Sequence, residues 1–150
     1  MKTILQRVSR ASVRVDGEVI GAVERGVLLL VAVERGDSEA DAMTTARKIA
    51  SLRIFPGRTP MDHSLLDVGG GCLVVSQFTI AGTVRKGRRP SFDRAALPDL
   101  ANDLYERVVA ALRAEGLTVA TGRFAAHMEV ELVNDGPVTI VIESRDGAIQ

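Results

Sequence analysis

The sequence has one cysteine, Cys72, no tryptophan, and only 3% aromatic residues among its 150 positions. A single cysteine cannot form an intrachain disulfide, which favours a reducing compartment. Because Cys72 lies inside an apolar stretch, we expect a buried structural thiol and not a nucleophile. With so few aromatic rings, a core must be built from Val, Leu, Ile and Ala, and such a core suits strands packed against helices.

The chain also lacks an excess of charge of either sign. Its 19 basic and 19 acidic residues give a formal net charge of zero at pH 7. No overall field draws it to nucleic acid, so any such contact must come from a local patch. No apolar stretch approaches the roughly 20 residues of a membrane-spanning helix, and residues 1–7 lack the apolar core of a signal peptide. We expect a cytoplasmic protein without membrane contacts.

The familiar catalytic motifs are missing as well. His63 and His127 are the only histidines, and neither has metal-ligand spacing to the other or to Cys72. There is no HExxH, GxSxG or P-loop motif. Residues 69–71 are glycines that precede an apolar segment and open no helix, which favours a plain turn over a phosphate-binding loop. We therefore expect no metal and no cofactor, and no spacing indicates a Ser-His-Asp triad.

The elements that are present can be predicted from apolar spacing. A chain of 150 residues fits one domain, residues 1–150, because a second core would be hard to fill. Alternation around Asp16-Gly17 predicts a β-hairpin over residues 13–20. Continuous apolar residues over 27–33 indicate a strand buried on both faces. Helical spacing follows over 37–54, with Ser38 as its cap.

The second half of the chain continues the alternation of strands and helices. Residues 72–80 are expected to form a strand, and residues 98–115 form the clearest helix, with Leu100 in its apolar stripe. Alternating residues over 127–133 predict a half-buried strand, which resumes over 138–142 after a turn. This order predicts an α+β fold in which a mixed, strongly curved, barrel-like sheet packs against two main helices.

Three segments are unusual for a plain structural domain. The first is Ser76-Gln77-Phe78-Thr79, where polar residues end a buried strand. Sites are often built at such a sheet edge, although a strand that simply enters a loop would look the same. The second has four basic residues within five positions of a Gly/Pro loop, namely Arg85, Lys86, Arg88 and Arg89. They form a plausible phosphate contact or a solvated loop.

The third segment is residues 134–139, with the sequence Asn-Asp-Gly-Pro-Val-Thr. Asp135-Gly136 predicts a turn, and Pro137 lacks the N–H that a strand ladder requires. A Gly-Pro bond adopts the cis form at a cost of only about 0.5–1 kcal/mol. From these residues alone, a tight turn is the simpler interpretation.

Taken together, the chain resembles the D-aminoacyl-tRNA deacylase family along nearly its whole length. Residues 76–79 match its SQFT signature and residues 134–139 its NDGPVT signature, which begins 58 positions later. The likeness extends to residues 5–13, to the basic loop over 86–92, and to residues 52–55, which match the end of the family's first helix. There are departures, at Ile80, Ala81 and the atypical segment 56–63, and at Ala125, where the family usually has Gly.

The resemblance implies a D-aminoacyl-tRNA deacylase-like fold and a homodimeric editing hydrolase that acts on tRNA. Its substrate would be the ester that joins a D-amino acid, or glycine mischarged on tRNA-Ala, to the 3′-terminal adenosine. Such an ester is already activated, so the enzyme mainly positions it and stabilises the oxyanion. These roles would fall to Ser76, Gln77, Phe78 and Thr79, largely through the backbone, with help from the 2′-hydroxyl of the substrate.

The resemblance also assigns residues to selectivity. A cis bond between Gly136 and Pro137 would enter the site from the partner subunit and reject L-aminoacyl-tRNA by overlap. Substrate contacts would come from Asn134 and Met128, and tRNA contacts from Arg85, Lys86, Arg88 and Arg89.

Three alternatives stay open at this point. Thr79 could act as a covalent nucleophile, but it lacks an evident base. The chain could be a non-catalytic RNA-binding module that uses the basic loop, against which stand zero net charge and few stacking aromatics. A small-molecule esterase would need a nucleophile-base pair that the sequence does not indicate.

Overall fold

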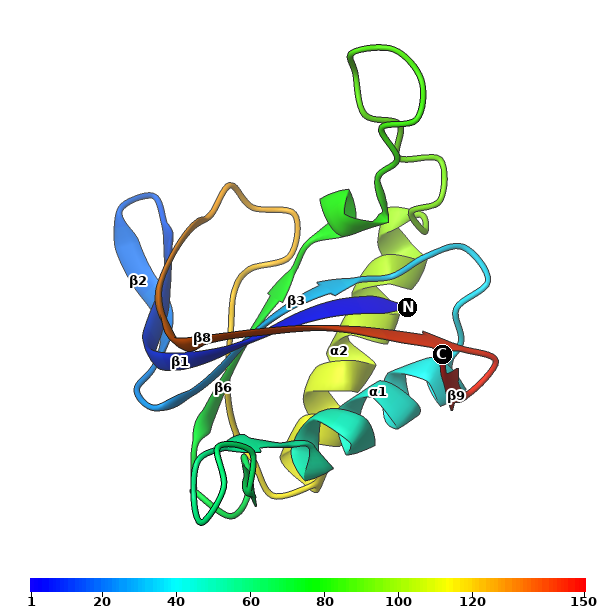
Figure 1. Ribbon diagram of the computed structural model, residues 1–150. Coiled ribbons are helices and arrows are strands. Elements are labelled where there is room, and N and C mark those ends of the chain that lie inside the picture. The colour runs from blue at the N-terminus through cyan, green and yellow to red at the C-terminus, as the bar shows by residue number, and fades with distance from the viewer.

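The computed structural model describes residues 1–150 as a curled sheet of seven strands with two helices against one face (Figure 1). The strands are β1 (Lys2–Val15), β2 (Glu18–Val23), β3 (Gly26–Ala32), β4 (Arg53–Phe55), β5 (His63–Ser64), β6 (Gly71–Ser76), β7 (Thr118–Thr121), β8 (Glu129–Arg145) and β9 (Ala148–Ile149). The helices are α1 (Glu39–Ser51), α2 (Pro98–Ala114) and a short 3-10 helix, η1 (Phe78–Ala81).

The sheet is mixed, as its sequence pattern predicts. The strand order is β7-β6-β3-β1-β8-β9, and β2 pairs with β1 in addition to the two neighbours that β1 has in this order. The pairs β3–β6 and β6–β7 are parallel, whereas β1 pairs antiparallel with β2, β3 and β8. Strands β4 and β5 form a separate antiparallel pair. The α+β class, the curved mixed sheet and the two main helices are therefore confirmed.

The curl of the sheet depends on the predicted hairpin and on one glycine. Asp16 and Gly17 form the turn between β1 and β2 with φ values of 52° and 82°. This hairpin brings β2 over β7, where a Cβ on Gly21 would lie 2.5 Å from the carbonyl oxygen of Thr121. Only glycine allows the two backbones to come this close, so Gly21 allows β2 and β7 to close one side of the sheet.

The core lies between the sheet and the two helices. Helix α1 begins after Ser38, whose N–H and hydroxyl both donate to the carboxylate of Asp41 at 2.8 and 2.9 Å. Tyr105 of α2 is buried and donates its hydroxyl to the carbonyl oxygen of Val74 at 2.9 Å. Cys72 has no exposed surface, and burial raises the pKa of its thiol, which is therefore structural as expected. None of the helices is long and apolar enough to cross a membrane.

Two predicted boundaries and one predicted core position are wrong. Helix α1 ends at Ser51 instead of residue 54, because Leu52 is extended and Arg53–Phe55 forms β4. Strand β6 ends at Ser76 instead of continuing to residue 80, where the chain is a 3-10 turn. Leu100 is 42% exposed and does not join the buried stripe of α2. Buried apolar spacing is similar in a short helix end and a short strand, so spacing alone does not fix where either stops.

The predicted turn between residues 133 and 138 is also wrong, because β8 runs through it as one strand. Both halves of β8 pair with β1: Thr139 is opposite Gln6, and Asn134 is opposite Val8. Residues 135–138 therefore bulge out opposite Arg7 alone. A bulge leaves residues without a ladder partner, and this accommodates Pro137, which has no N–H to donate.

Candidate active site

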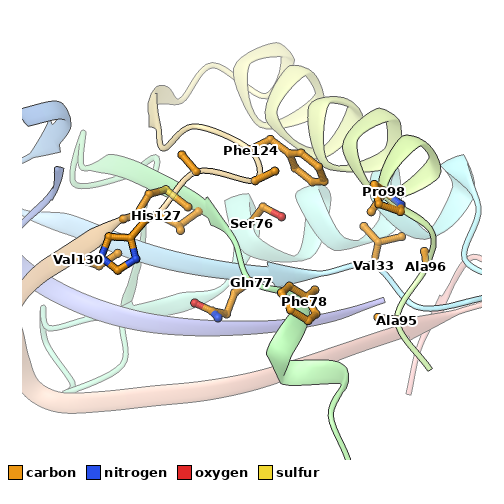
Figure 2. Close-up of a pocket in the computed structure, with 15 residues that line it drawn as sticks. Val33, Ser76, Gln77, Phe78, Ala95, Ala96, Pro98, Phe124, His127 and Val130 are labelled. Atoms are coloured by element: carbon orange, nitrogen blue, oxygen red, sulfur yellow. The ribbon is translucent and has the colours of Figure 1, made fainter. Parts of the chain in front are cut away.

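A cavity of about 510 Å³ lies at the carboxyl end of β6 (Figure 2). Fifteen residues line it, and eleven of them are hydrophobic. Apart from Val33, they come from residues 75–78, 95–101 and 124–130. The carboxyl ends of neighbouring parallel strands, here β3 and β6, meet at one edge of a sheet, where sites are commonly built. Ligand sites are usually apolar cavities with a few polar groups.

The first wall is formed where β6 stops. The N–H of Gln77 donates to the carbonyl oxygen of Val31 at 2.8 Å, the last bond that joins this segment to β3. The chain then turns into η1, closed by a bond from the N–H of Gly82 to the carbonyl oxygen of Thr79 at 3.0 Å. This change of direction places Ser76, Gln77 and Phe78 on the cavity wall.

Thr79 does not line the cavity. Its side chain is exposed, and its hydroxyl accepts a hydrogen bond from the side-chain amide of Gln77. Of the four residues of the first signature, the structure therefore brings three to the cavity and leaves the fourth beside them. A hydroxyl that lies outside the cavity and contacts no base is not arranged as a nucleophile.

The second wall is the connection between β7 and β8. It includes Met128, whose sulfur packs so closely on Gly122 that a Cβ there would lie 2.7 Å from it. Ala125 lines the same wall and has a φ of +59°. This left-handed conformation is one that glycine adopts without strain. It makes Ala125 a strained residue in this chain.

The third wall was not predicted from the sequence. Ala96 donates its N–H to the carbonyl oxygen of Val33 at 3.0 Å, which brings the start of α2 against β3. Ala95, Pro98 and Ala101 then complete the lining. Small side chains here keep the cavity open. Alanine and proline around a helix start indicate only where the helix begins, so no sequence signal could have identified them as site residues.

His127 is the only ionisable residue of the lining. Its side chain is exposed. Its imidazole makes no hydrogen bond to the hydroxyl of Ser76, and the two lie apart in Figure 2. The cavity therefore contains no nucleophile-base pair of the kind that a conventional esterase uses.

Gly136 and Pro137 lie outside this cavity, in the bulge of β8. Their peptide bond is cis. Arg7 supports the bulge from within: its side chain is nearly buried, its Nε donates to the carbonyl oxygen of Asp135 at 2.9 Å, and its Nη1 donates to that of Ile54 at 2.6 Å. The tip of the bulge is exposed.

Asn134 stabilises the same bulge from the side. Its Oδ1 accepts the N–H of Val138 at 3.1 Å, and its Nδ2 donates to the hydroxyl of Thr139 at 3.0 Å. The bulge is thus well ordered by hydrogen bonds, but it contributes no residue to the cavity of its own chain. The two sequence signatures do not form one site within a single chain.

The basic loop rises from a short pairing of Thr83 with Ser91, with N–O distances of 2.8 and 2.9 Å in the two directions. It is the green loop that projects from the body in Figure 1. Four exposed basic side chains lie on it, and none of them forms an ion pair: Arg85, Lys86, Arg88 and Arg89.

The sequence of this chain matches a known protein family. The model of the D-Tyr-tRNA(Tyr) deacylase family matches residues 4–143. The chain belongs to the D-aminoacyl-tRNA deacylase family. It is 57% identical to a D-aminoacyl-tRNA deacylase of Koribacter versatilis over 97% of this chain and 98% of that protein. The family resemblance of the sequence is therefore confirmed.

Solved structures support the same fold for this deacylase-family chain. The c-Myc DNA unwinding element binding protein is 38% identical, with a TM-score of 0.89 over 96% of this chain and 99% of that one. A probable eukaryotic D-amino acid tRNA deacylase is only 19% identical, yet it has a TM-score of 0.81 over 93% and 97% of the two chains. The predicted deacylase-like fold is confirmed.

Proposed function

We propose that the cavity at the end of β6 is the place where this chain hydrolyses the ester of D-aminoacyl-tRNA. As a member of the D-aminoacyl-tRNA deacylase family, the chain is an aminoacyl-tRNA ester hydrolase. One observation supports this location above all: residues Ser76, Gln77 and Phe78 turn into the wall of the main cavity. The terminal adenosine of tRNA and its aminoacyl group would enter there.

The chemistry would rest on backbone groups. The first N–H groups of a helix have no partner within it, and in η1 these belong to Phe78 and Thr79. They would donate to the carbonyl oxygen of the ester as water adds to its carbon and negative charge develops. Collapse of this intermediate breaks the bond to the ribose 3′-oxygen, which takes up a proton. The neighbouring 2′-hydroxyl of the substrate would assist, because the cavity wall provides no base paired with a nucleophile.

The role of Thr79 can be tested separately. We expect Thr79→Ala to retain substantial activity, because the hydroxyl lies outside the cavity and only accepts a bond from Gln77. The measurement is kcat on D-tyrosyl-tRNA, with Thr79→Ser as the variant that keeps the hydroxyl. Complete loss in Thr79→Ala, with the fold intact and an acyl-enzyme trapped in the wild type, would support the nucleophile instead.

Chiral selection would come from the bulge of a second copy. Gly136 and Pro137 are exposed, are supported by Arg7, and contribute nothing to the cavity of their own chain. In a homodimer they would face the α-carbon of the substrate in the partner's cavity. A backbone wall there excludes an L side chain by overlap, whereas glycine has nothing to overlap, so glycyl-tRNA charged on tRNA-Ala should also be hydrolysed.

The surface around the bulge supports such a dimer. Val133 and Val141 lie on the same strand on either side of it and are 38% and 57% exposed. An interface that includes the bulge would cover both of these apolar side chains. Asn134 would reach the substrate of the partner only together with this segment, because its amide is already bonded to Val138 and Thr139.

The basic loop would contact the phosphates of tRNA. Replacing its four cations, Arg85, Lys86, Arg88 and Arg89, with Gln should raise KM for tRNA more than it lowers kcat. It should also lower the slope of log KM against log salt concentration by up to about 3 for the four cations, since each contact with a single strand contributes about 0.7 to that slope. The exposed pair Arg47 and Lys48 on α1, changed to Gln, is the control. Equal salt dependence in both variants would contradict this role.

The deciding experiment compares matched D- and L-tyrosyl-tRNA, with glycyl-tRNA-Ala as a third substrate. We expect rapid ester loss from the D form and from the glycyl form, and almost none from the L form. Equal rates on both enantiomers would refute the gate, and no loss from the D form would refute the function. Tight tRNA binding without any ester loss would instead indicate the RNA-binding module.

A further inference from the structure

Phe78 is an unusual aromatic residue in this chain. The sequence has only five aromatic residues, and two of them, Phe55 and Tyr105, are at most 2% exposed. The ring of Phe78 is 53% exposed, although it also borders the cavity. A large exposed aromatic at the mouth of a cavity is more consistent with a binding surface than with core packing.

The ring is held in place by a second aromatic. Phe92 meets it edge to face, with ring centroids 5.1 Å apart and an interplanar angle of 69°. Phe92 in turn lies against Gly82, where a Cβ would be 2.9 Å from its ring and 2.9 Å from the carbonyl oxygen of Thr79. A residue larger than glycine would displace the pair. The exposed part of Phe78 is therefore a supported surface and not a loose side chain.

The two rings stand at the base of the basic loop. The loop leaves the body at Thr83, directly after Gly82, and returns at Ser91, directly before Phe92. Its four cations carry no ion pairs and thus remain available for a partner. Along this edge of the molecule, the structure places an apolar cavity, then an exposed ring, then unpaired positive charge.

We propose that the exposed ring of Phe78 stacks on the base of the nucleotide that precedes the terminal adenosine of tRNA, while the basic loop contacts phosphates of the same single-stranded end. This inference rests on the proposed function, which places the terminal adenosine in the cavity. A single strand presents bases and phosphates in alternation, and proteins bind it with aromatic rings beside basic grooves. The next base beyond the cavity would meet the first aromatic surface at its mouth.

Charge favours RNA over a protein partner here. A protein partner would place apolar groups against Phe78 but would leave four cations to be neutralised at the rim of the interface. Each nucleotide of a single strand offers a base to the exposed ring and a phosphate to the cations. The surface also needs no base-specific hydrogen bond, because stacking accepts any base.

The test is a double-mutant cycle between the ring and the base. The ring is changed by Phe78→Leu, which keeps an apolar side chain without a π face, or by Phe78→Tyr, which keeps the π face. The base is removed by an abasic nucleotide at the position before the terminal adenosine of uncharged tRNA-Tyr. Affinity is measured by fluorescence anisotropy, so the cycle does not depend on catalysis. Leu97→Ala, a change at an exposed apolar residue beside the cavity, is the control.

We expect loss of the base to weaken binding to wild type about tenfold, the range expected for one stacked base. Phe78→Leu should bind the intact tRNA about tenfold more weakly and lose nothing further with the abasic tRNA. Phe78→Tyr and Leu97→Ala should show the same abasic penalty as wild type. Circular dichroism and urea unfolding check that each variant folds.

Two results would overturn the proposal. One is an equal abasic penalty in Phe78→Leu and wild type, which means that ring and base do not interact. The other is a shift of Phe78→Leu from dimer to monomer in light scattering without any coupling to the base, which would show that a second copy covers the ring. Failure of the proposed function gives a different result. Wild type would then leave the ester of D-tyrosyl-tRNA intact, whether or not the binding cycle shows coupling between the ring and the base.

Discussion

The cavity wall at residues 76–78 and the bulge at residues 135–138 both lie where strand pairing stops, but with opposite results. Strand β6 stops pairing after Ser76, and the freed chain turns into η1 and forms one wall of the cavity. Strand β8 resumes its pairing with β1 beyond the bulge, so that the bulge is fixed at both ends and projects from the sheet. One interruption makes a concave surface, and the other makes a protrusion.

The cavity and the bulge each lack what the other has. The cavity has a lining contributed entirely by one chain, but no residue of the bulge is in it. The bulge has buried support from Arg7 but nothing to act on in its own chain. A cavity without the bulge and a bulge without a cavity suit the proposed homodimer, in which each copy would complete the other. Damage to the bulge should therefore change selectivity first, and damage to the cavity should change rate first.

The largest effect is expected from Arg7→Met. The change keeps an apolar stem but leaves the carbonyl oxygens of Asp135 and Ile54 without the donors they have now. An unsatisfied buried acceptor costs about 1–3 kcal/mol. The bond to Ile54 is buried and the bond to Asp135 is partly buried, so we expect the free energy of unfolding to fall by about 3 kcal/mol. The unsupported bulge should also reject L-aminoacyl-tRNA less well, and the measure is the ratio of D to L hydrolysis.

Arg10→Met is the matched control for this change. Arg10 lies on the same strand and is exposed, so its replacement should change stability by no more than about 0.5 kcal/mol. If both variants are equally stable and equally selective, then Arg7 does not support the bulge and the contrast between the two regions fails.

A somewhat smaller effect is expected from Gly136→Ala. Gly136 has a φ of +131°, and a Cβ there would lie 2.8 Å from Nη2 of Arg7 and 3.1 Å from the backbone nitrogen of Val138. Backbone strain together with this crowding should lower stability by about 2 kcal/mol and reduce the D to L ratio. In Gly36→Ala, φ is +91° but the space is open, so we expect about 1 kcal/mol and unchanged selectivity. Equal selectivity in both variants would argue against the gate.

The fold was predictable where local spacing and tertiary packing agree. The hairpin at Asp16-Gly17 follows from alternation and turn composition, the buried strand β3 follows from a continuous apolar run, and α2 begins and ends within one residue of its prediction. Prediction failed where a distant residue decides. Asp135-Gly136 has the composition of a turn, yet the guanidinium of Arg7 fills the space behind it and lets one strand continue.

The site was predictable only in part, for a similar reason. Residues 76–78 of the first signature line the cavity, and so does Met128, for which the resemblance implied a substrate contact. The third wall, at the start of α2, carries no reactive side chain and gives no sequence signal. The position of Thr79 beside the cavity depends on η1, which apolar spacing had suggested was a strand. Short 3-10 turns follow from the local loss of strand pairing, and a single sequence does not reveal where pairing ends.

A moderate effect should come from beneath the cavity, with Tyr105→Phe. The buried hydroxyl donates to the carbonyl oxygen of Val74, which also accepts the N–H of Gly122 at 3.0 Å. Removing one of two donors should lower the free energy of unfolding by about 1 kcal/mol and loosen β6 below the cavity. We expect kcat on D-tyrosyl-tRNA to fall while the D to L ratio stays constant. A changed ratio would mean that rate and selectivity are not separate properties of the two regions.

The smallest effect should be a gain in stability, from Ala125→Gly. Ala125 holds a φ of +59°, which costs an L residue about 1–2 kcal/mol, whereas glycine adopts it freely. Glycine also loses more conformational entropy on folding, by about 0.5–1 kcal/mol, so the net gain should be about 0.5 kcal/mol in urea unfolding. Ala126→Gly, at a neighbour without positive φ, should lose stability instead. Because this strain lies on the cavity wall, relieving it tests whether the wall is tuned for activity: unchanged kcat would mean that the strain is incidental, and a lower kcat that it shapes the cavity.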